Sequence, residues 1–221
     1  MTIDFSVIEP YIGVFARAAV VTAMVSLIAF GASAVLAALL LPMRVAKSKV
    51  ARATIGTYIE LMRNLPILLV LYVVYYGLPT LGVPMGAFVA AIVALALNST
   101  AYMIEIYRGG LNAIPIGHTE AAQSLGLRKP TVWRNIYLPQ AIKYSFPAIG
   151  NQLVACVLGS SLAMLIGTKE LTNAATVVGS ASFRYFETFI IVALIYIMLS
   201  QFITFVWTRL YAVSFGRKYG V

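Results

Sequence analysis

Long runs without a charged residue constrain this chain more than any other feature. The longest runs are Ala18 to Met43, Asn64 to Ile104, Tyr144 to Thr168 and Thr188 to Thr208. A helix needs about 20 predominantly apolar residues to cross a bilayer. Hydrophobic residues make up 61% of the chain and charged residues 10%, whereas about a quarter of the residues in a soluble domain are charged. The sequence therefore predicts an all-α membrane protein and excludes a soluble domain.

Turn signals divide these runs into five predicted transmembrane helices. Two glycines and two prolines between Gly77 and Pro84 form an uncharged turn within the longest run, which is long enough for two crossings. The predicted spans are about 18–43, 56–77, 85–107, 140–167 and 187–209, within a single transmembrane domain of residues 1–221. The first run is too long for the core of a signal peptide, so we expect it to be retained as a helix. The stretch from Lys169 to Arg184 is expected to be a loop.

Lysine and arginine are distributed unevenly between the two sides of these spans. One side carries most of them: Arg44, Lys47, Lys49, Arg52, Arg63, Arg108, Arg128, Lys129, Arg134, Lys143, Arg209, Arg217 and Lys218. The other side carries Arg17, Lys169 and Arg184. Because cytoplasmic loops are enriched in Lys and Arg, this predicts that the N-terminus is outside and the C-terminus in the cytoplasm. The net charge of +9 then reflects loop topology, and no basic stripe with interleaved aromatics indicates nucleic-acid binding.

One polar, basic segment, at about 117–139, separates the predicted third and fourth spans. Its pattern predicts two short amphipathic helices joined at Gly126, the first from His118 to Leu125 with Glu120 in its first turn. Gly126 readily adopts the left-handed conformation that ends a helix, and Pro130 suits the first turn of the next one. The charge count places this segment in the cytoplasm.

The spacing in this segment resembles the EAA loop of the membrane subunits of ATP-binding-cassette importers. The matching positions are Glu120, Ala121, Ala122, Gly126, Ile136, Leu138 and Pro139. In that family the loop is a coupling helix, which sits in a groove of the ATPase subunit and transmits its closure to the membrane helices. The alternative interpretation is an interfacial loop whose glutamate caps a helix.

Further matches make the chain similar to the polar amino acid permeases, which import histidine, arginine, glutamine, glutamate or cystine. The matching runs are Arg63 to Leu69, Tyr75 to Pro79, Ala101 to Gly117, and Ser160 to Leu171. The resemblance implies a permease subunit of a bacterial cytoplasmic (inner) membrane importer that works by alternating access. It also implies a second permease subunit, separate ATPase subunits that bind ATP and Mg²⁺, and an external solute-binding protein. No cofactor is expected in this chain.

Polar residues inside the spans are the candidates for a substrate path. They are Asn98, Tyr102, Gln152, Ser160 and Ser161, with Asn151 beside them. Polar groups in membrane helices also mediate helix packing, typically worth about 0.6 kcal/mol each, and this alternative remains open. The polar amino acid permeases, which the chain resembles, often have an aspartate where this chain has Gly159. The ammonium group of a substrate would therefore be held by other groups or by the second permease. Glu105 with Arg108, and Glu60 with Arg63, are predicted to form interfacial ion pairs.

The sequence shows no set of catalytic or metal-binding residues. It lacks the Gly-x-x-x-x-Gly-Lys-Ser/Thr loop that holds nucleotide phosphates, so ATP hydrolysis is expected only in a partner subunit. With one cysteine, Cys156, and one histidine, His118, neither a disulfide within the chain nor a zinc site is expected. The competing functions are an ion-coupled secondary transporter or channel without an ATPase, and a membrane scaffold or sensor.

Overall fold

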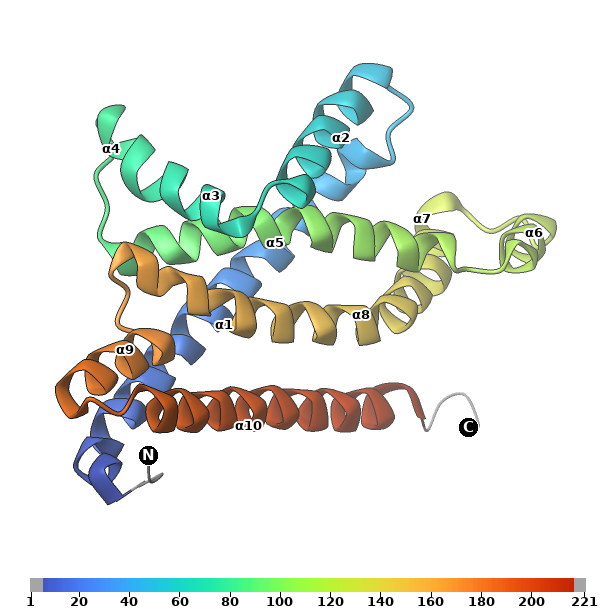
Figure 1. Cartoon of the computed structure of the whole chain (residues 1–221). Coiled ribbons are helices and arrows are strands. Elements are labelled where there is room, and N and C mark those ends of the chain that lie inside the picture. The colour runs from blue at the N-terminus through green and yellow to red at the C-terminus, as the bar shows by residue number, and fades with distance from the viewer. Residues whose placement is uncertain (1–5, 217–221) are drawn as a thin grey trace.

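The computed structural model describes residues 6–216, which form an all-helical protein (Figure 1). In chain order the elements are η1 (Ser6–Tyr11), α1 (Ile12–Arg44), α2 (Lys49–Asn64), α3 (Ile67–Tyr72), η2 (Val73–Gly77), α4 (Leu78–Thr80), α5 (Ala87–Asn112), α6 (Ile116–Ser124), α7 (Lys129–Val132), η3 (Trp133–Tyr137), α8 (Leu138–Gly159), η4 (Ser160–Ile166), α9 (Leu171–Ser182), α10 (Tyr185–Tyr211) and η5 (Ala212–Gly216). No strand occurs in this range, and the prediction of an all-α protein is confirmed for it.

Four helical stretches are long and apolar enough to cross a membrane. They are Glu9–Arg44, Ala87–Asn112, Lys129–Ile166 and Tyr185–Gly216. A bent pair, Lys49–Asn64 with Ile67–Thr80, supplies a fifth crossing if it is counted as one span. The first helix extends beyond its predicted span of 18–43, since α1 already begins at Ile12. The uncharged run marks the apolar centre of a helix, whereas backbone hydrogen bonding continues past a charged residue such as Arg17.

The second predicted span, 56–77, contains a sharp bend. The chain bends by 107° between α2 and the stretch Ile67–Thr80, because Pro66 ends α2. A proline disfavours the helical conformation of the residue before it, and Leu65 has extended angles, with φ −83° and ψ 135°. Pro66 also has no N–H to donate to the carbonyl of Met62. The span is therefore two helical segments where we expected one helix.

A helix, α9, occupies much of the stretch that we expected to be a loop. The Glu170 carboxylate caps its first turn by accepting hydrogen bonds from the backbone N–H groups of Thr172 and Asn173, at 2.9 and 2.8 Å. α9 packs against α1 and α10, where Leu171 and Val178 are buried. This helix lacks the length of a span, so a search for long apolar runs does not find it.

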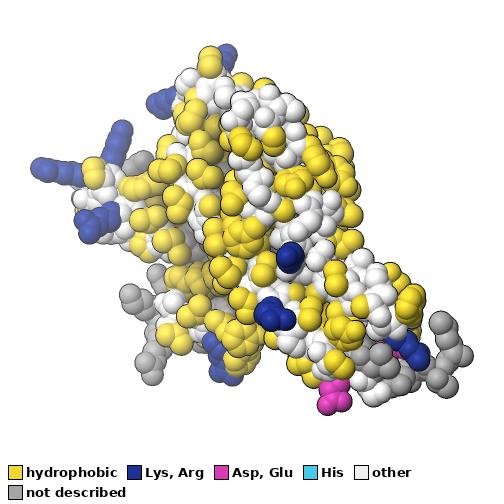
Figure 2. Space-filling view, turned by 90° about the vertical axis from the view of Figure 1, so that its left-hand side faces the viewer, with side chains coloured by type: hydrophobic (Ala, Val, Ile, Leu, Met, Phe, Trp, Pro, Cys, Tyr) yellow, Lys and Arg dark blue, Asp and Glu magenta, His cyan; other side chains and the backbone are white. Residues whose placement is uncertain are grey.

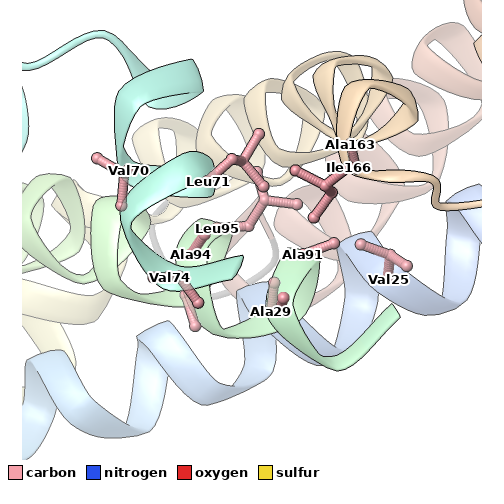
Figure 3. Packing of buried hydrophobic residues seen from close by; sticks show 12 residues of the cluster. Val25, Ala29, Val70, Leu71, Val74, Ala91, Ala94, Leu95, Ala163 and Ile166 are labelled. Atoms are coloured by element: carbon pink, nitrogen blue, oxygen red, sulfur yellow. The ribbon is translucent and has the colours of Figure 1, made fainter. Parts of the chain in front are cut away.

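Small and branched apolar side chains fill the core where α1, α3, α5 and η4 meet (Figure 3). The labelled residues are Val25, Ala29, Val70, Leu71, Val74, Ala91, Ala94, Leu95, Ala163 and Ile166. Alanine at such contacts lets helix backbones approach closely, which is how helices pack in membranes without a hydrophobic driving force between them. The same cluster holds α3 against α5 after the bend.

The polar segments lie at one end of the molecule. In Figure 1, α6 and α7 stand at the right-hand end, the end toward which α10 runs, while α4, α9 and η1 lie at the opposite end. α5, α8 and α10 run between the two ends, and α1 crosses them obliquely. Figure 2 views the end formed by α4 and α9, where apolar side chains dominate and basic ones are scattered.

Candidate functional site

The segment between α5 and α8 is built around a left-handed glycine. Gly126 has φ +65°, and its N–H donates to the carbonyl of Gln123 at 2.9 Å. The N–H of Leu127 donates to the carbonyl of Ala122 at 3.1 Å. These two bonds form a Schellman motif, which satisfies the last carbonyls of α6. The predicted helix end at Gly126 is confirmed, and Pro130 stands in the first turn of α7 as expected.

Glu120 does not lie in the first turn of its helix, so that prediction is wrong. α6 starts at Ile116, two residues before the expected beginning, with Pro115 preceding it in an extended conformation. The electrostatic effect of a helix end fades within the first turn. Glu120 is exposed, and its carboxylate does not cap the N-terminus of α6.

Two side-chain hydrogen bonds tie α6 to the junction of η3 and α8. Nδ1 of His118 lies 2.7 Å from Oε1 of Gln140, and the hydroxyls of Thr119 and Tyr137 are 2.6 Å apart. Ala122 is 2% exposed and is the buried residue of α6. These contacts fix the orientation of α6 through polar side chains. The sequence pattern did not predict that these side chains pair.

The remaining side chains of this segment form an exposed surface that is partly apolar. Of the seven positions that match the EAA spacing, Ala122 is buried, Ile136 is half-buried and the others are exposed: Glu120, Ala121, Gly126, Leu138 and Pro139. Ile116 and Leu125 are each 75% exposed. Leu125 is followed closely in sequence by the basic residues Arg128 and Lys129, and exposed apolar side chains rimmed by polar ones are typical of a surface that binds another macromolecule.

Asn98 and Tyr102 contact the bend between α2 and α3. The side-chain amide of Asn98 donates to the carbonyl of Met62 at 2.7 Å, the group that Pro66 leaves without its usual partner. The hydroxyl of Tyr102 lies 3.5 Å from the carbonyl of Arg63, and the Arg63 guanidinium is 5.4 Å from the centre of the Tyr102 ring. Both side chains thus stabilise a helix end in this structure.

The other predicted path residues do not join that cluster. Gln152 donates to the Ser99 hydroxyl at 3.1 Å, and Ser99 lies 3.0 Å from the sulfur of the buried Cys156. Cys156 therefore packs at the contact between α5 and α8. The hydroxyls of Ser160 and Ser161, in η4, donate to carbonyls three residues earlier in the last turn of α8, at 2.7 Å each. Asn151 instead lines a cavity of about 160 Å³ between α8 and α10.

Glu105 joins two arginines from different helices. Its carboxylate accepts from Nε of Arg108 at 2.9 Å, which confirms the predicted pair, and from Nε of Arg44 at 2.8 Å. This three-residue network links the ends of α1 and α5. The predicted pair of Glu60 with Arg63 is wrong, because Glu60 accepts a hydrogen bond from Asn64 and Arg63 lies over Tyr102.

Glu170 is a buried polar residue whose position the sequence analysis missed. It is 0% exposed and accepts a hydrogen bond from the Tyr196 hydroxyl at 2.7 Å, in addition to those from two backbone N–H groups of α9. Burial raises the pKa of this carboxyl, and the hydrogen bonds act in the opposite direction. The sequence does contain a signal for this position, because Glu170 directly precedes a helix and acidic residues often cap the N-terminus of a helix.

Comparison with known proteins places this architecture in one family. The family model described as "Binding-protein-dependent transport system inner membrane component" matches residues 29–215. "Probable amino-acid ABC transporter permease protein YckA" of Bacillus subtilis (strain 168) is 36% identical over 175 residues, which cover 79% of this chain and 77% of that protein. "Arginine transport system permease protein ArtQ" of the same strain is 41% identical over 150 residues, covering 67% and 68%.

A solved structure agrees with these sequence matches. The chain superposes on the "Crystal structure of an amino acid ABC transporter with histidines" with a TM-score of 0.90 and 33% identity, covering 96% of this chain and 99% of that one. The fold and the relatives thus define a permease subunit of the ATP-binding-cassette class. This chain belongs to the family of binding-protein-dependent transport system inner membrane components, and the resemblance to amino acid permeases is confirmed.

Proposed function

We propose that the chain is the translocation subunit of an ATP-driven importer for polar amino acids. The segment α6 to η3 is the coupling element, which docks in a groove of a separate ATPase subunit that binds ATP and Mg²⁺. Closure of the ATPase pulls the coupling segments together and opens the path outward, and hydrolysis resets it. Glu120, Ala121 and Gly126 transmit force through backbone and packing contacts, and this chain performs no catalysis itself.

The observation that carries this proposal is the exposed surface of α6. Ile116 on α6 and Leu125 directly after it are each 75% exposed, and keeping apolar surface in water costs about 25 cal/mol for each Å² relative to burying it. The Schellman motif and the hydrogen bonds of His118 and Thr119 hold that surface in one orientation. An oriented apolar surface beside basic residues supports docking to a protein partner.

The distribution of charge supports a bacterial inner membrane location with α6 on the cytoplasmic side. Most Lys and Arg residues lie in the segments that we assigned to that side, and Arg17, Lys169 and Arg184 are the exceptions. The N-terminus is then outside and the C-terminus inside. This topology brings α6 to the compartment that contains ATP.

The proposed substrate class rests on the relatives, several of which are named as amino acid, arginine or glutamine permeases. Gly159 stands where the polar amino acid permeases often have an aspartate. A Cβ added at Gly159 would lie 3.4 Å from a side-chain methyl of Leu95. We propose that a second permease subunit, identical or homologous, completes the path. An external solute-binding protein delivers the substrate.

The experiment that tests this function is mild-detergent purification of the chain from its native membrane, followed by mass spectrometry of the associated proteins. Recovery of an ATPase with a second permease supports a heteromeric importer, and an ATPase alone supports a homodimer. The absence of an ATPase, under conditions that preserve known complexes of this class, would favour an ion-coupled transporter and overturn the proposal.

A further inference from the structure

A cavity of about 420 Å³ lies between α1 and α9, at the end of the molecule opposite α6. Three polar side chains line it: Arg17 from α1, Lys169 from the residues before α9, and Asn173 from the first turn of α9. Valine and alanine side chains of the two helices form the rest of its wall. The cavity thus combines two cations and an amide with an apolar surface.

The two cations of this cavity have no anionic partner within residues 6–216. Arg184, the third basic residue assigned to this side, pairs with Glu187 at 3.2 Å. Arg17 and Lys169 take part in no ion pair or hydrogen bond in that range. The carboxylate of Glu170 is close in sequence, but it is fully buried and already accepts three hydrogen bonds. Two like charges on one cavity are stabilised by an anion bound between them.

The depth of Arg17 indicates which anion suits this cavity. Arg17 directly precedes the uncharged run that starts at Ala18, so it lies where the apolar part of the helix meets the polar region of a bilayer. The helix face that contains Arg17 continues at helical spacing through Val21 to Met24 and Ile28, and the last two are 47% and 46% exposed. A phosphate held by Arg17 would therefore have an apolar surface below it, which suits an acyl chain and not a soluble anion.

We propose that this cavity is a binding site for an anionic phospholipid. Arg17 and Lys169 bind the headgroup phosphate, the side-chain amide of Asn173 donates a hydrogen bond to it, and an acyl chain lies along α1. The site requires that the chain spans a bilayer, and it is independent of the proposed coupling to an ATPase. A phospholipid held there would stabilise the packing of α9 against α1 in the leaflet opposite the coupling segment.

The test is native mass spectrometry of the purified, intact transporter titrated with phosphatidylglycerol and, separately, with phosphatidylethanolamine. A basic residue near a membrane surface contributes about fivefold to the binding of anionic lipid. We expect Arg17→Gln/Lys169→Gln to weaken phosphatidylglycerol binding about 25-fold and to change phosphatidylethanolamine binding little. The control, Lys47→Gln/Arg52→Gln, removes the same charge beyond the other end of α1, in the following loop and in α2, and is expected to keep the affinity of this site. The single variants Arg17→Gln and Lys169→Gln, each expected to bind about fivefold more weakly, serve if the double variant fails to assemble.

A photoreactive amino acid at Val177, which lines the cavity, identifies the occupant directly. Crosslinking to a phospholipid in native membranes supports the site. Crosslinking to the solute-binding protein or to a second permease would show a protein interface and overturn the proposal. Equal phosphatidylglycerol affinity in the wild type and the double variant would also overturn it, as would full displacement of the lipid by inorganic phosphate at millimolar concentration, which indicates a site for a free anion.

Discussion

At the scale of single residues, Glu170 combines complete burial with an ionisable carboxyl. Because burial raises its pKa above the ordinary 4.5, the folded protein holds this proton to a higher pH than the unfolded chain does. The associated stability is fully present below pH 4.5 and is lost as the pH rises through the raised pKa. The stability of the fold around Glu170 is therefore expected to depend on the protonation of this one side chain.

We expect the melting temperature of the detergent-solubilised protein to fall as the pH rises from 4.5 through that window, and Glu170→Gln to flatten this part of the profile. Thermal melts at a series of pH values provide the measurement. Glu120→Gln, a change in an exposed carboxylate on α6, is the control and is expected to retain the wild-type profile. An unchanged profile in Glu170→Gln would contradict the assignment.

Gly150 illustrates a second residue-scale constraint, a close helix contact. A Cβ added at Gly150 would lie 2.3 Å from Cδ1 of Trp207, and the Trp207 ring is held by a 2.6 Å hydrogen bond to the carbonyl of Phe146. We expect Gly150→Ala to destabilise the protein by about 1–3 kcal/mol, the usual cost of overpacking. Gly31→Ala is the matched control, because no atom lies within 4 Å of the added Cβ. Thermal denaturation of both variants compares them, and equal melting temperatures would exclude the clash.

At the scale of elements, the bend between α2 and α3 depends on a donor from α5. Removing the Asn98 side chain leaves the Met62 carbonyl without that partner, and an unsatisfied polar group costs about 1–3 kcal/mol. We expect Asn98→Ala to lower the melting temperature. Ser161→Ala removes only a hydroxyl bonded to its own helix and should change stability by less than about 0.5 kcal/mol. If Asn98→Ala instead kept full stability and raised only the KM for substrate, Asn98 would be a substrate contact.

The element α6 allows a test of coupling that separates it from folding. Gly126 has φ +65°, a region that costs other residues about 1–2 kcal/mol and that proline cannot adopt. We expect Gly126→Pro to abolish substrate-stimulated ATPase activity while membrane insertion is retained. Gly117→Ala, on α6 itself and with open space around the added Cβ, should keep that activity. Full stimulation in an assembled Gly126→Pro complex would argue against the coupling role.

At the scale of the whole molecule, the two ends in Figure 1 should face opposite sides of the membrane. Leu81, between α4 and α5, is 76% exposed, and Leu125, after α6, is 75% exposed. A membrane-impermeant maleimide is expected to label Leu81→Cys in spheroplasts, and Leu125→Cys only in inverted vesicles. The native Cys156 is 2% exposed, so the unsubstituted chain serves as the unlabelled control. The reverse labelling pattern would invert the proposed topology.

Local properties explain how much of this molecule could be predicted from its sequence. An uncharged apolar run defines a membrane helix wherever it occurs, and a left-handed glycine ends a helix through its own backbone. The long helices, the turn at Gly126 and the membership of a permease family were therefore predictable. The pair Glu105 and Arg108 was predictable as well, because residues three apart lie on the same side of a helix.

The tertiary structure alone decided which distant residues meet. Asn98 pairs with the carbonyl of Met62, and Arg44 joins Glu105, because α5 lies beside α2 and α1. The cavity lined by Arg17 and Lys169 exists because α9 packs on α1. The hydrophobic periodicity of either helix does not predict this contact. Sequence by itself determined what each segment is, through hydropathy and backbone preference. Packing determined which polar groups are satisfied, since hydrogen bonds and ion pairs depend on neighbours that the fold brings together.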